Sequence, residues 1–148
     1  MENNQNITIK DIKKAWDDYL NNSNTVQPEY SLWEETVRLF NEFPYFIKFL
    51  KKRGHNEIFY PYLTFSFIVD FMDYLYESNE MIELSKIINF LDKMRNSGNI
   101  EVINLLDVGV LENFDRLMHF HEIFPLMSEG VKIEFKKYYS HYLNIAQR

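Results

Sequence analysis

The 148-residue chain contains no cysteine, which excludes a disulfide framework, a thiolate metal site and a cysteine nucleophile. It has only four glycines and four prolines, too few for the frequent turns of a β-sandwich or β-barrel. The first residues lack the basic and apolar regions of a signal peptide, and the longest apolar stretch is interrupted by Pro61, Asp70 and Asp73. We therefore expect a cytoplasmic protein with no membrane-spanning segment.

Positive charge is also scarce, since 16 Lys and Arg residues face 22 Asp and Glu residues, for a net charge of −6 at pH 7. Non-specific binding of nucleic acids depends on Lys and Arg neutralising phosphates, so this balance argues against a nucleic-acid partner. The densest basic cluster, residues 48–55, contains a glycine stop and fits the cationic C-terminus of a helix. If the charge implies a partner, that partner is basic.

Apolar residues recur at helical spacing along most of the chain, and the aromatic content of 17% indicates a core dominated by large rings. Capping and stop signals predict helices over about 8–21, from Ser31, from Pro44 to Gly54, over 61–77, from Ser78 or Asn79 to Gly98, and over 129–146. The sequence therefore predicts an all-α fold, a single domain covering residues 1–148. It would be a helical bundle or short α-α superhelix of about seven helices.

Residues 99–114, NIEVINLLDVGVLENF, are nearly all apolar but carry Asp107 and Gly109 in the middle. Ile103, Leu106 and Val110 follow helical spacing, whereas adjacent apolar pairs contradict the alternation of a half-buried strand. Glycine in a helix interior costs about 1 kcal/mol relative to alanine. We predict two short, nearly continuous helices with a bend at 107–109.

The predicted helix over 61–77 is apolar except for Ser66, Asp70, Asp73 and Glu77, which form a narrow polar stripe. It is expected to be the most buried helix. Paired carboxylates can act in acid–base catalysis, but a stripe facing solvent or a partner is the commoner role. With Glu80 and Glu83 it forms the most concentrated negative charge in the chain. The predicted partner-binding residues are Asp70, Asp73, Tyr74, Glu77 and Glu80.

Catalytic and metal-binding patterns are not evident. His119 and His121 are two residues apart, so they point to different sides of a helix and lack the i, i+4 spacing of a helical zinc pair. No glycine-rich phosphate loop, nucleophile elbow or Ser-His-Asp arrangement can be identified. We therefore expect no enzymatic activity, no cofactor and no metal.

The middle of the chain, about residues 60–114, is similar to small all-helical bacterial families of contact-dependent and polymorphic toxin systems, presumed to be immunity proteins. The resemblance is carried by the segments YPYLTFSFIVDFMDYL and LSKIINFLDKMRNSGN and by Val102, Asn104, Leu105, Leu106, Val108, Gly109, Leu111, Glu112, Asn113 and Phe114. It implies an acidic inhibitor that neutralises a toxin by direct binding, its partner being a basic toxin domain encoded nearby. The alternative is a non-enzymatic helical adaptor or scaffold protein.

Overall fold

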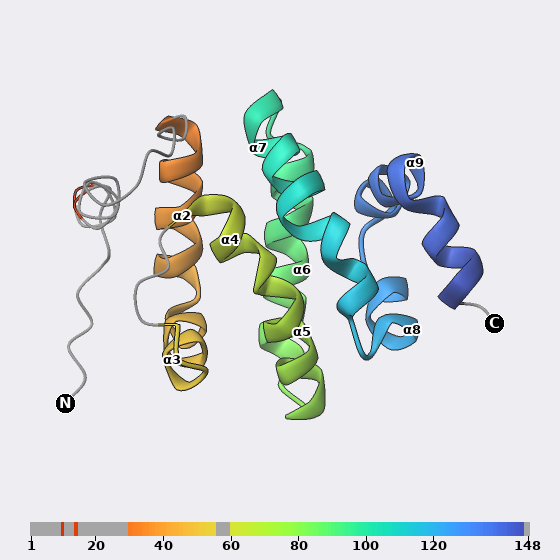
Figure 1. The fold of residues 1–148 in the computed structure, drawn as a ribbon, viewed down its shortest axis with the longest axis horizontal. Coiled ribbons are helices and arrows are strands. Elements are labelled where there is room, and N and C mark those ends of the chain that lie inside the picture. The colour runs from red at the N-terminus through yellow and green to blue at the C-terminus, as the bar shows by residue number, and fades with distance from the viewer. Residues whose placement is uncertain (1–9, 11–13, 15–29, 56–59, 147–148) are drawn as a thin grey trace. The chain divides into compact units, whose positions relative to one another are not determined.

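A computed structural model describes residues 10, 14, 30–55 and 60–146. All regular elements among them are helical, and the all-α class is confirmed. They fall into two compact units, one ending at Thr64 and the next beginning at Phe65 (Figure 1). The expectation of one domain over 1–148 stays a prediction. In this part of the chain no helix is both long and apolar enough to cross a membrane. The helix predicted over 8–21 lies outside the described residues, apart from Lys10 and Lys14.

The first unit contains α2 (Tyr30–Glu42) and α3 (Pro44–Lys52), which pack against each other. Pro44 begins α3, as predicted, because its missing N–H would have no helical partner in a first turn. The rings of Phe40 and Phe46 stack across the two helices with centroids 6.1 Å apart. A left-handed glycine, Gly54 with φ +84°, follows α3, as the sequence predicted.

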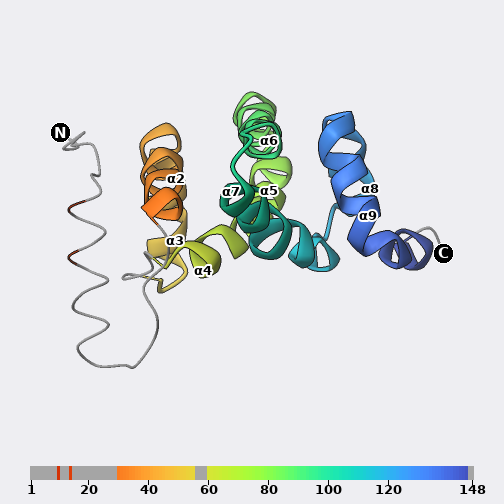
Figure 2. The same cartoon turned by 90° about the horizontal axis from the view of Figure 1, so that it is seen from above.

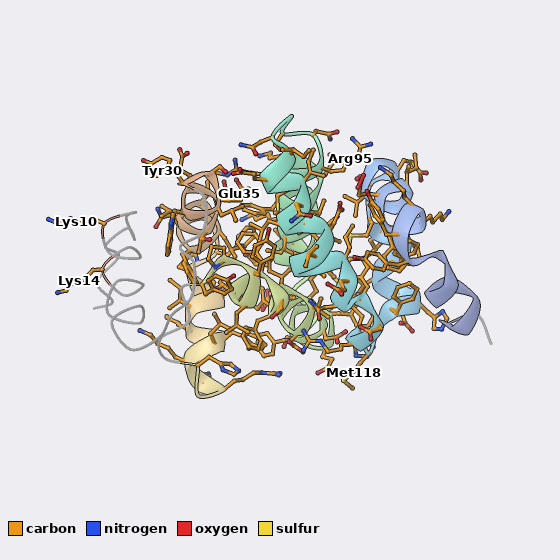
Figure 3. All side chains as sticks on the ribbon, turned by 45° about the horizontal axis from the view of Figure 1, so that its top comes forward. Lys10, Lys14, Tyr30, Glu35, Arg95 and Met118 are labelled. Atoms are coloured by element: carbon orange, nitrogen blue, oxygen red, sulfur yellow. The ribbon has the colours of Figure 1, made fainter. Side chains whose placement is uncertain are left out.

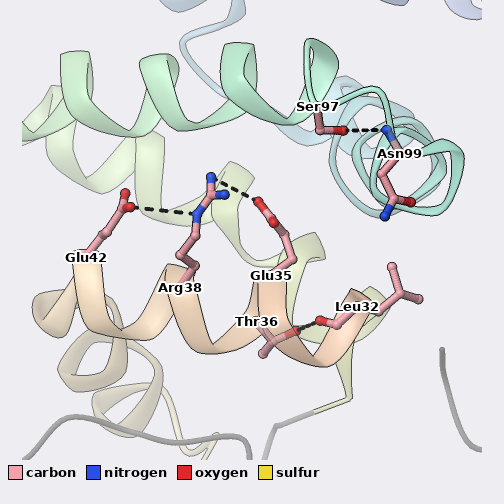
Figure 4. Close-up of polar contacts among 7 residues, drawn as sticks. All are labelled: Leu32, Glu35, Thr36, Arg38, Glu42, Ser97 and Asn99. Carbon is pink, nitrogen blue, oxygen red and sulfur yellow. Dashed lines mark hydrogen bonds and ion pairs between the residues drawn. The ribbon is translucent and has the colours of Figure 1, made fainter. Parts of the chain in front are cut away.

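Salt bridges run along α2 (Figure 4). The Arg38 guanidinium lies 3.3 Å from Glu35 and 3.8 Å from Glu42, the i, i+3 and i, i+4 spacings at which helical side chains meet. Ser31 lies inside α2, because the helix already includes Tyr30. The start predicted at Ser31 is therefore wrong, because the residue lies within the helix.

In the helix predicted over 61–77, the structure shows a break at Phe67, between α4 (Pro61–Ser66) and α5 (Ile68–Glu77). The prediction of one continuous helix is thus wrong. At the break, Arg116 donates a 2.7 Å hydrogen bond to the Ser66 carbonyl. The partner of this backbone group is therefore a side chain 50 residues further along the chain. The burial prediction holds for α5, where Phe71 is only 1% exposed.

A tight hairpin joins α5 to α6 (Met81–Arg95), and the two helices lie side by side in both ribbon views (Figures 1 and 2). Asn79 adopts a left-handed conformation with φ +56°, and the Glu80 N–H donates to the Leu75 carbonyl at 2.8 Å. This is the hydrogen-bond pattern of a Schellman C-cap. Asn79 therefore ends α5, whereas the sequence analysis placed Ser78 or Asn79 at the start of α6.

Residues 100–116 are helical throughout, but their winding changes along the chain. The segment comprises α7 (Ile100–Asn104), the π-helix η1 (Leu105–Val110) and the 3-10 helix η2 (Leu111–Arg116). Asn99 caps α7, its side-chain oxygen accepting hydrogen bonds from the backbone N–H groups of residues 101 and 102 at 3.0 and 3.3 Å; Figure 4 shows the cap residue. The irregularity predicted at 107–109 is therefore a π-helix, a wider turn that often marks functional sites.

The chain ends in α8 (Phe120–Ile123), the 3-10 helix η3 (Phe124–Leu126) and α9 (Glu129–Ala146), the last with the predicted bounds. Phe135 on α9 joins an aromatic cluster whose centroids lie 5.0 to 6.5 Å apart; its other members are Phe114, Phe120, Phe124 and Tyr139. Such packing confirms that large rings fill this part of the core. The sequence spacing places Tyr138 on the same face as Phe135, but its side chain is 51% exposed and Lys137 lies over its ring.

Phe71→Ala should lower the free energy of unfolding by about 3–5 kcal/mol, because it removes a fully buried ring from α5. Urea denaturation followed by circular dichroism measures this change. The matched control is Ile82→Ala on α6, whose side chain is 76% exposed and whose loss should cost less than about 0.5 kcal/mol. Equal unfolding midpoints for the two variants would contradict the assignment of α5 as a core helix.

Candidate protein-binding surface

The predicted stripe residues Asp70, Asp73 and Glu77 lie along α5. Each contacts the segment 116–119, which runs from the last residue of η2 to the residue before α8. Helical spacing put these carboxylates on one face, as predicted. What the sequence did not indicate is that this face packs against another part of the same chain. The stripe is therefore first of all an attachment between elements.

Asp73 makes the most specific of these contacts. Its two carboxylate oxygens accept hydrogen bonds from the backbone N–H groups of Met118 at 2.8 Å and His119 at 3.0 Å. The side chain is only 6% exposed. An ionised acceptor bound to two backbone donors is a strong and directional arrangement. Asp73 thus holds the turn before α8 and does not face outward, in contrast to the partner-facing role predicted for it.

The other two carboxylates are closer to solvent and have cationic or polar neighbours. Asp70 lies 3.6 Å from the Arg116 guanidinium, and Glu77 lies 3.0 Å from Nε2 of His119. The His119 ring also packs on Tyr76, with centroids 4.7 Å apart. The negative charge predicted for this face is therefore partly balanced by residues that the sequence analysis did not connect with it.

Two exposed apolar side chains belong to the same region. Tyr74, which follows Asp73 in α5, is 44% exposed, and Met118, whose N–H binds Asp73, is 79% exposed. Figure 3 shows Met118 at the edge of the second unit. Glu80 is exposed just beyond α5, where its backbone closes the hairpin. We call the group of Asp70, Tyr74, Glu77, Glu80, Arg116, Met118 and His119 the α5 turn surface.

Sequence reasoning missed Arg116, Met118 and His119 as members of this surface. The histidine was considered only as a metal ligand. A single exposed methionine after a 3-10 helix has no sequence pattern that marks it, because its position depends on the Asp73 contact 45 residues earlier. Among the described residues, no three His, Asp or Glu side chains lie close enough together to hold a metal ion.

A second group of charged residues lies apart from this surface. Asp107 on η1 is 9% exposed and Glu134 on α9 is 6% exposed, and Arg95 of α6 lies beside Glu134. The sequence did signal Asp107, as a charge inside an apolar run. It offered no such sign for Glu134, whose neighbours in the sequence include Lys132, Lys136 and Lys137.

Residues 36–144 match the model of a family described as a domain of unknown function, DUF7674. The chain belongs to the DUF7674 family. The matched segment includes the whole α5 turn surface and the buried charges at Asp107 and Glu134. The family description assigns no activity or partner. Comparison with curated proteins and with solved structures gave no significant match.

In this DUF7674 domain, Asp73→Ala should lower the free energy of unfolding by about 2–4 kcal/mol, because two backbone donors lose an ionised acceptor. Asp70→Ala, in the same stripe, should cost about 0–1 kcal/mol, since its ion pair with Arg116 is near the surface. Chemical denaturation of both variants provides the comparison. Similar losses for the two would mean that Asp73 does not anchor the turn at 118–119.

Proposed function

We propose that this domain acts by binding another protein and that the partner docks on the α5 turn surface. The observation that carries the proposal is the exposure of Met118 on a backbone fixed by Asp73. Binding affinity comes mostly from a few apolar or aromatic anchors, and an anchor that is already held in place loses little freedom on binding. Tyr74, next to the same carboxylate in α5, is a second anchor.

The charge around these anchors favours a basic partner. Asp70 and Glu77 lie one helical turn before and after Tyr74, Glu80 follows α5, and the chain as a whole carries a net charge of −6. Charge complementarity of this kind mainly speeds association and orients the partner. We expect the partner to offer an apolar pocket for Met118 with Lys or Arg residues around it.

A more specific proposal is that the partner is a toxin domain encoded nearby, which this domain neutralises by covering its basic surface. Its support is the resemblance of residues 60–114 to immunity proteins of bacterial toxin systems, together with the acidic surface. An adaptor would use the same surface without blocking an activity. An inhibitor and an adaptor therefore differ in whether binding stops the partner's activity.

The test is to co-express the chain with the product of the adjacent open reading frame and to measure binding and growth. Complex formation together with rescue of growth would support inhibition, and complex formation without rescue would favour an adaptor. If the two proteins form no complex, the proposed partner is wrong.

With a complex in hand, Tyr74→Ala and Met118→Ala should each weaken binding about tenfold, which corresponds to about 1.4 kcal/mol. Glu77→Lys with Glu80→Lys should slow association and reduce its dependence on salt. Biolayer interferometry at two salt concentrations separates the two effects. Matched controls on α9 are Ile133→Ala, 59% exposed, and Glu129→Lys, which should leave binding unchanged. Equal losses from the α9 variants would place the interface elsewhere.

A further inference from the structure

The densest basic cluster of the chain lies on and directly after α3. Residues 44–55 contain four Lys and Arg residues, Lys48, Lys51, Lys52 and Arg53, and no Asp or Glu. All four are exposed. Lys51 and Lys52 lie in the last turn of α3, where cations complement the helix dipole. Among the described residues, no acidic side chain forms an ion pair with either of them. Their charge is therefore available to an approaching molecule.

An exposed aromatic ring lies beside these cations. The Tyr45 side chain is 62% exposed, and the Lys48 ammonium lies 5.4 Å from the centroid of its ring. Phe46 and Leu50 are buried, so the apolar face of α3 is already used within the first unit. The exposed face thus combines one aromatic ring with positive charge. We call the group of Tyr45, Lys48, Lys51, Lys52 and Arg53 the α3 basic surface.

The α3 basic surface and the α5 turn surface are opposite in charge, and each has an exposed side chain suited to the other. On the α5 turn surface, Glu77 and Glu80 are exposed carboxylates, and Met118 is 79% exposed. Contact between a methionine sulfur and an aromatic ring is favourable, so the Tyr45 ring is an apolar neighbour that Met118 can accept. The chain therefore carries both halves of a complementary contact.

We propose that the α3 basic surface of one copy of this chain docks on the α5 turn surface of a second copy. The Tyr45 ring then lies against Met118, and the ammonium groups of Lys51 and Lys52 lie near Glu77 and Glu80. This inference rests on the proposed function, which makes the α5 turn surface a docking site for a basic protein. Here the basic protein is the chain itself.

The contact joins two different surfaces, so it is heterologous. Each copy in a pair keeps one uncovered α3 basic surface and one uncovered α5 turn surface, and further copies can add head to tail. A copy whose α5 turn surface is covered cannot bind another protein there. Self-association therefore competes with the partner of the proposed function.

This self-association should be weak and sensitive to salt. Both copies carry a net charge of −6, which opposes their approach, while the attraction is confined to two exposed surfaces. Exposed charges are screened beyond about 8 Å at physiological ionic strength. The contact should therefore form at high protein concentration and be lost as salt is added.

The test is sedimentation equilibrium of the full chain at about 50 mM and about 500 mM salt, where screening differs strongly. The mean mass should rise with protein concentration at the lower salt and stay at the monomer value at the higher salt. This comparison uses the wild-type chain, so it does not depend on the folding of any variant. A wild-type chain that stays monomeric at the lower salt would overturn the proposal.

Charge reversal identifies the two surfaces. Lys51→Glu with Lys52→Glu, and separately Glu77→Lys with Glu80→Lys, should each abolish the rise in mass. Mixing the two variants should restore it, because each supplies a charge that the other has lost. Circular dichroism checks that both variants are folded. If the mixture of folded variants stays monomeric, the two surfaces do not contact each other.

Controls with the same changes in net charge are Lys86→Glu with Lys93→Glu and Glu112→Lys with Glu129→Lys, all at exposed positions. Both should self-associate as wild type does. An equal loss in these controls would make net charge the cause and overturn the proposed contact.

The apolar part of the contact is tested by alanine substitution. Tyr45→Ala and Met118→Ala should each weaken self-association about tenfold, and the two together by clearly less than about a hundredfold, because the side chains contact each other. Tyr30→Ala, also 62% exposed but on α2, should have no effect. Independent, fully additive losses would remove the Tyr45–Met118 contact from the proposal.

Failure of this inference can be distinguished from failure of the proposed function. If Glu77→Lys with Glu80→Lys abolishes self-association but leaves binding of the co-expressed partner unchanged, the self-association stands and the proposed function is wrong. If the wild-type chain is monomeric and the same variant weakens partner binding, only the self-association is wrong.

Discussion

The contact on which the second unit most depends is the one between the Asp73 carboxylate and the backbone of residues 118 and 119. It joins α5 to the segment between η2 and α8, 45 residues further along the chain. Because both donors are backbone groups, the contact fixes where the chain enters α8, whatever side chains lie there. Phe120 and Phe124 follow directly and pack against Phe114 and Phe135, so the position of this turn also decides the aromatic packing.

Other side chains also form hydrogen bonds to backbone groups where the helices change their winding. A helix that shifts from α to π or 3-10 geometry leaves backbone groups without their usual partners. Asn113 donates a hydrogen bond to the Gly109 carbonyl, and Tyr139 donates one to the Asp107 carbonyl. Arg116 donates one to the Ser66 carbonyl at the break before α5. These three side chains of the unit thus bond to irregular backbone.

The α5 turn surface and the carboxylates of Asp107 and Glu134 differ in their exposure to solvent. The α5 turn surface is open to solvent, and its charges act at a distance on an approaching partner. Asp107 on η1 and Glu134 on α9 are buried, so their charges act on the packing of these helices.

The sequence by itself determined the helical class, the bounds of α9, the cap at Asn99 and the left-handed turns at Gly54 and Gly98, since each depends on residues within a few positions. It also placed Asp70, Asp73 and Glu77 on one helix face. Only the tertiary structure decided that Asp73 is buried, that the helix over 61–77 breaks at Phe67, and that Glu134 lies beside Arg95. Those features depend on partners 39 to 50 residues away, which local periodicity does not report.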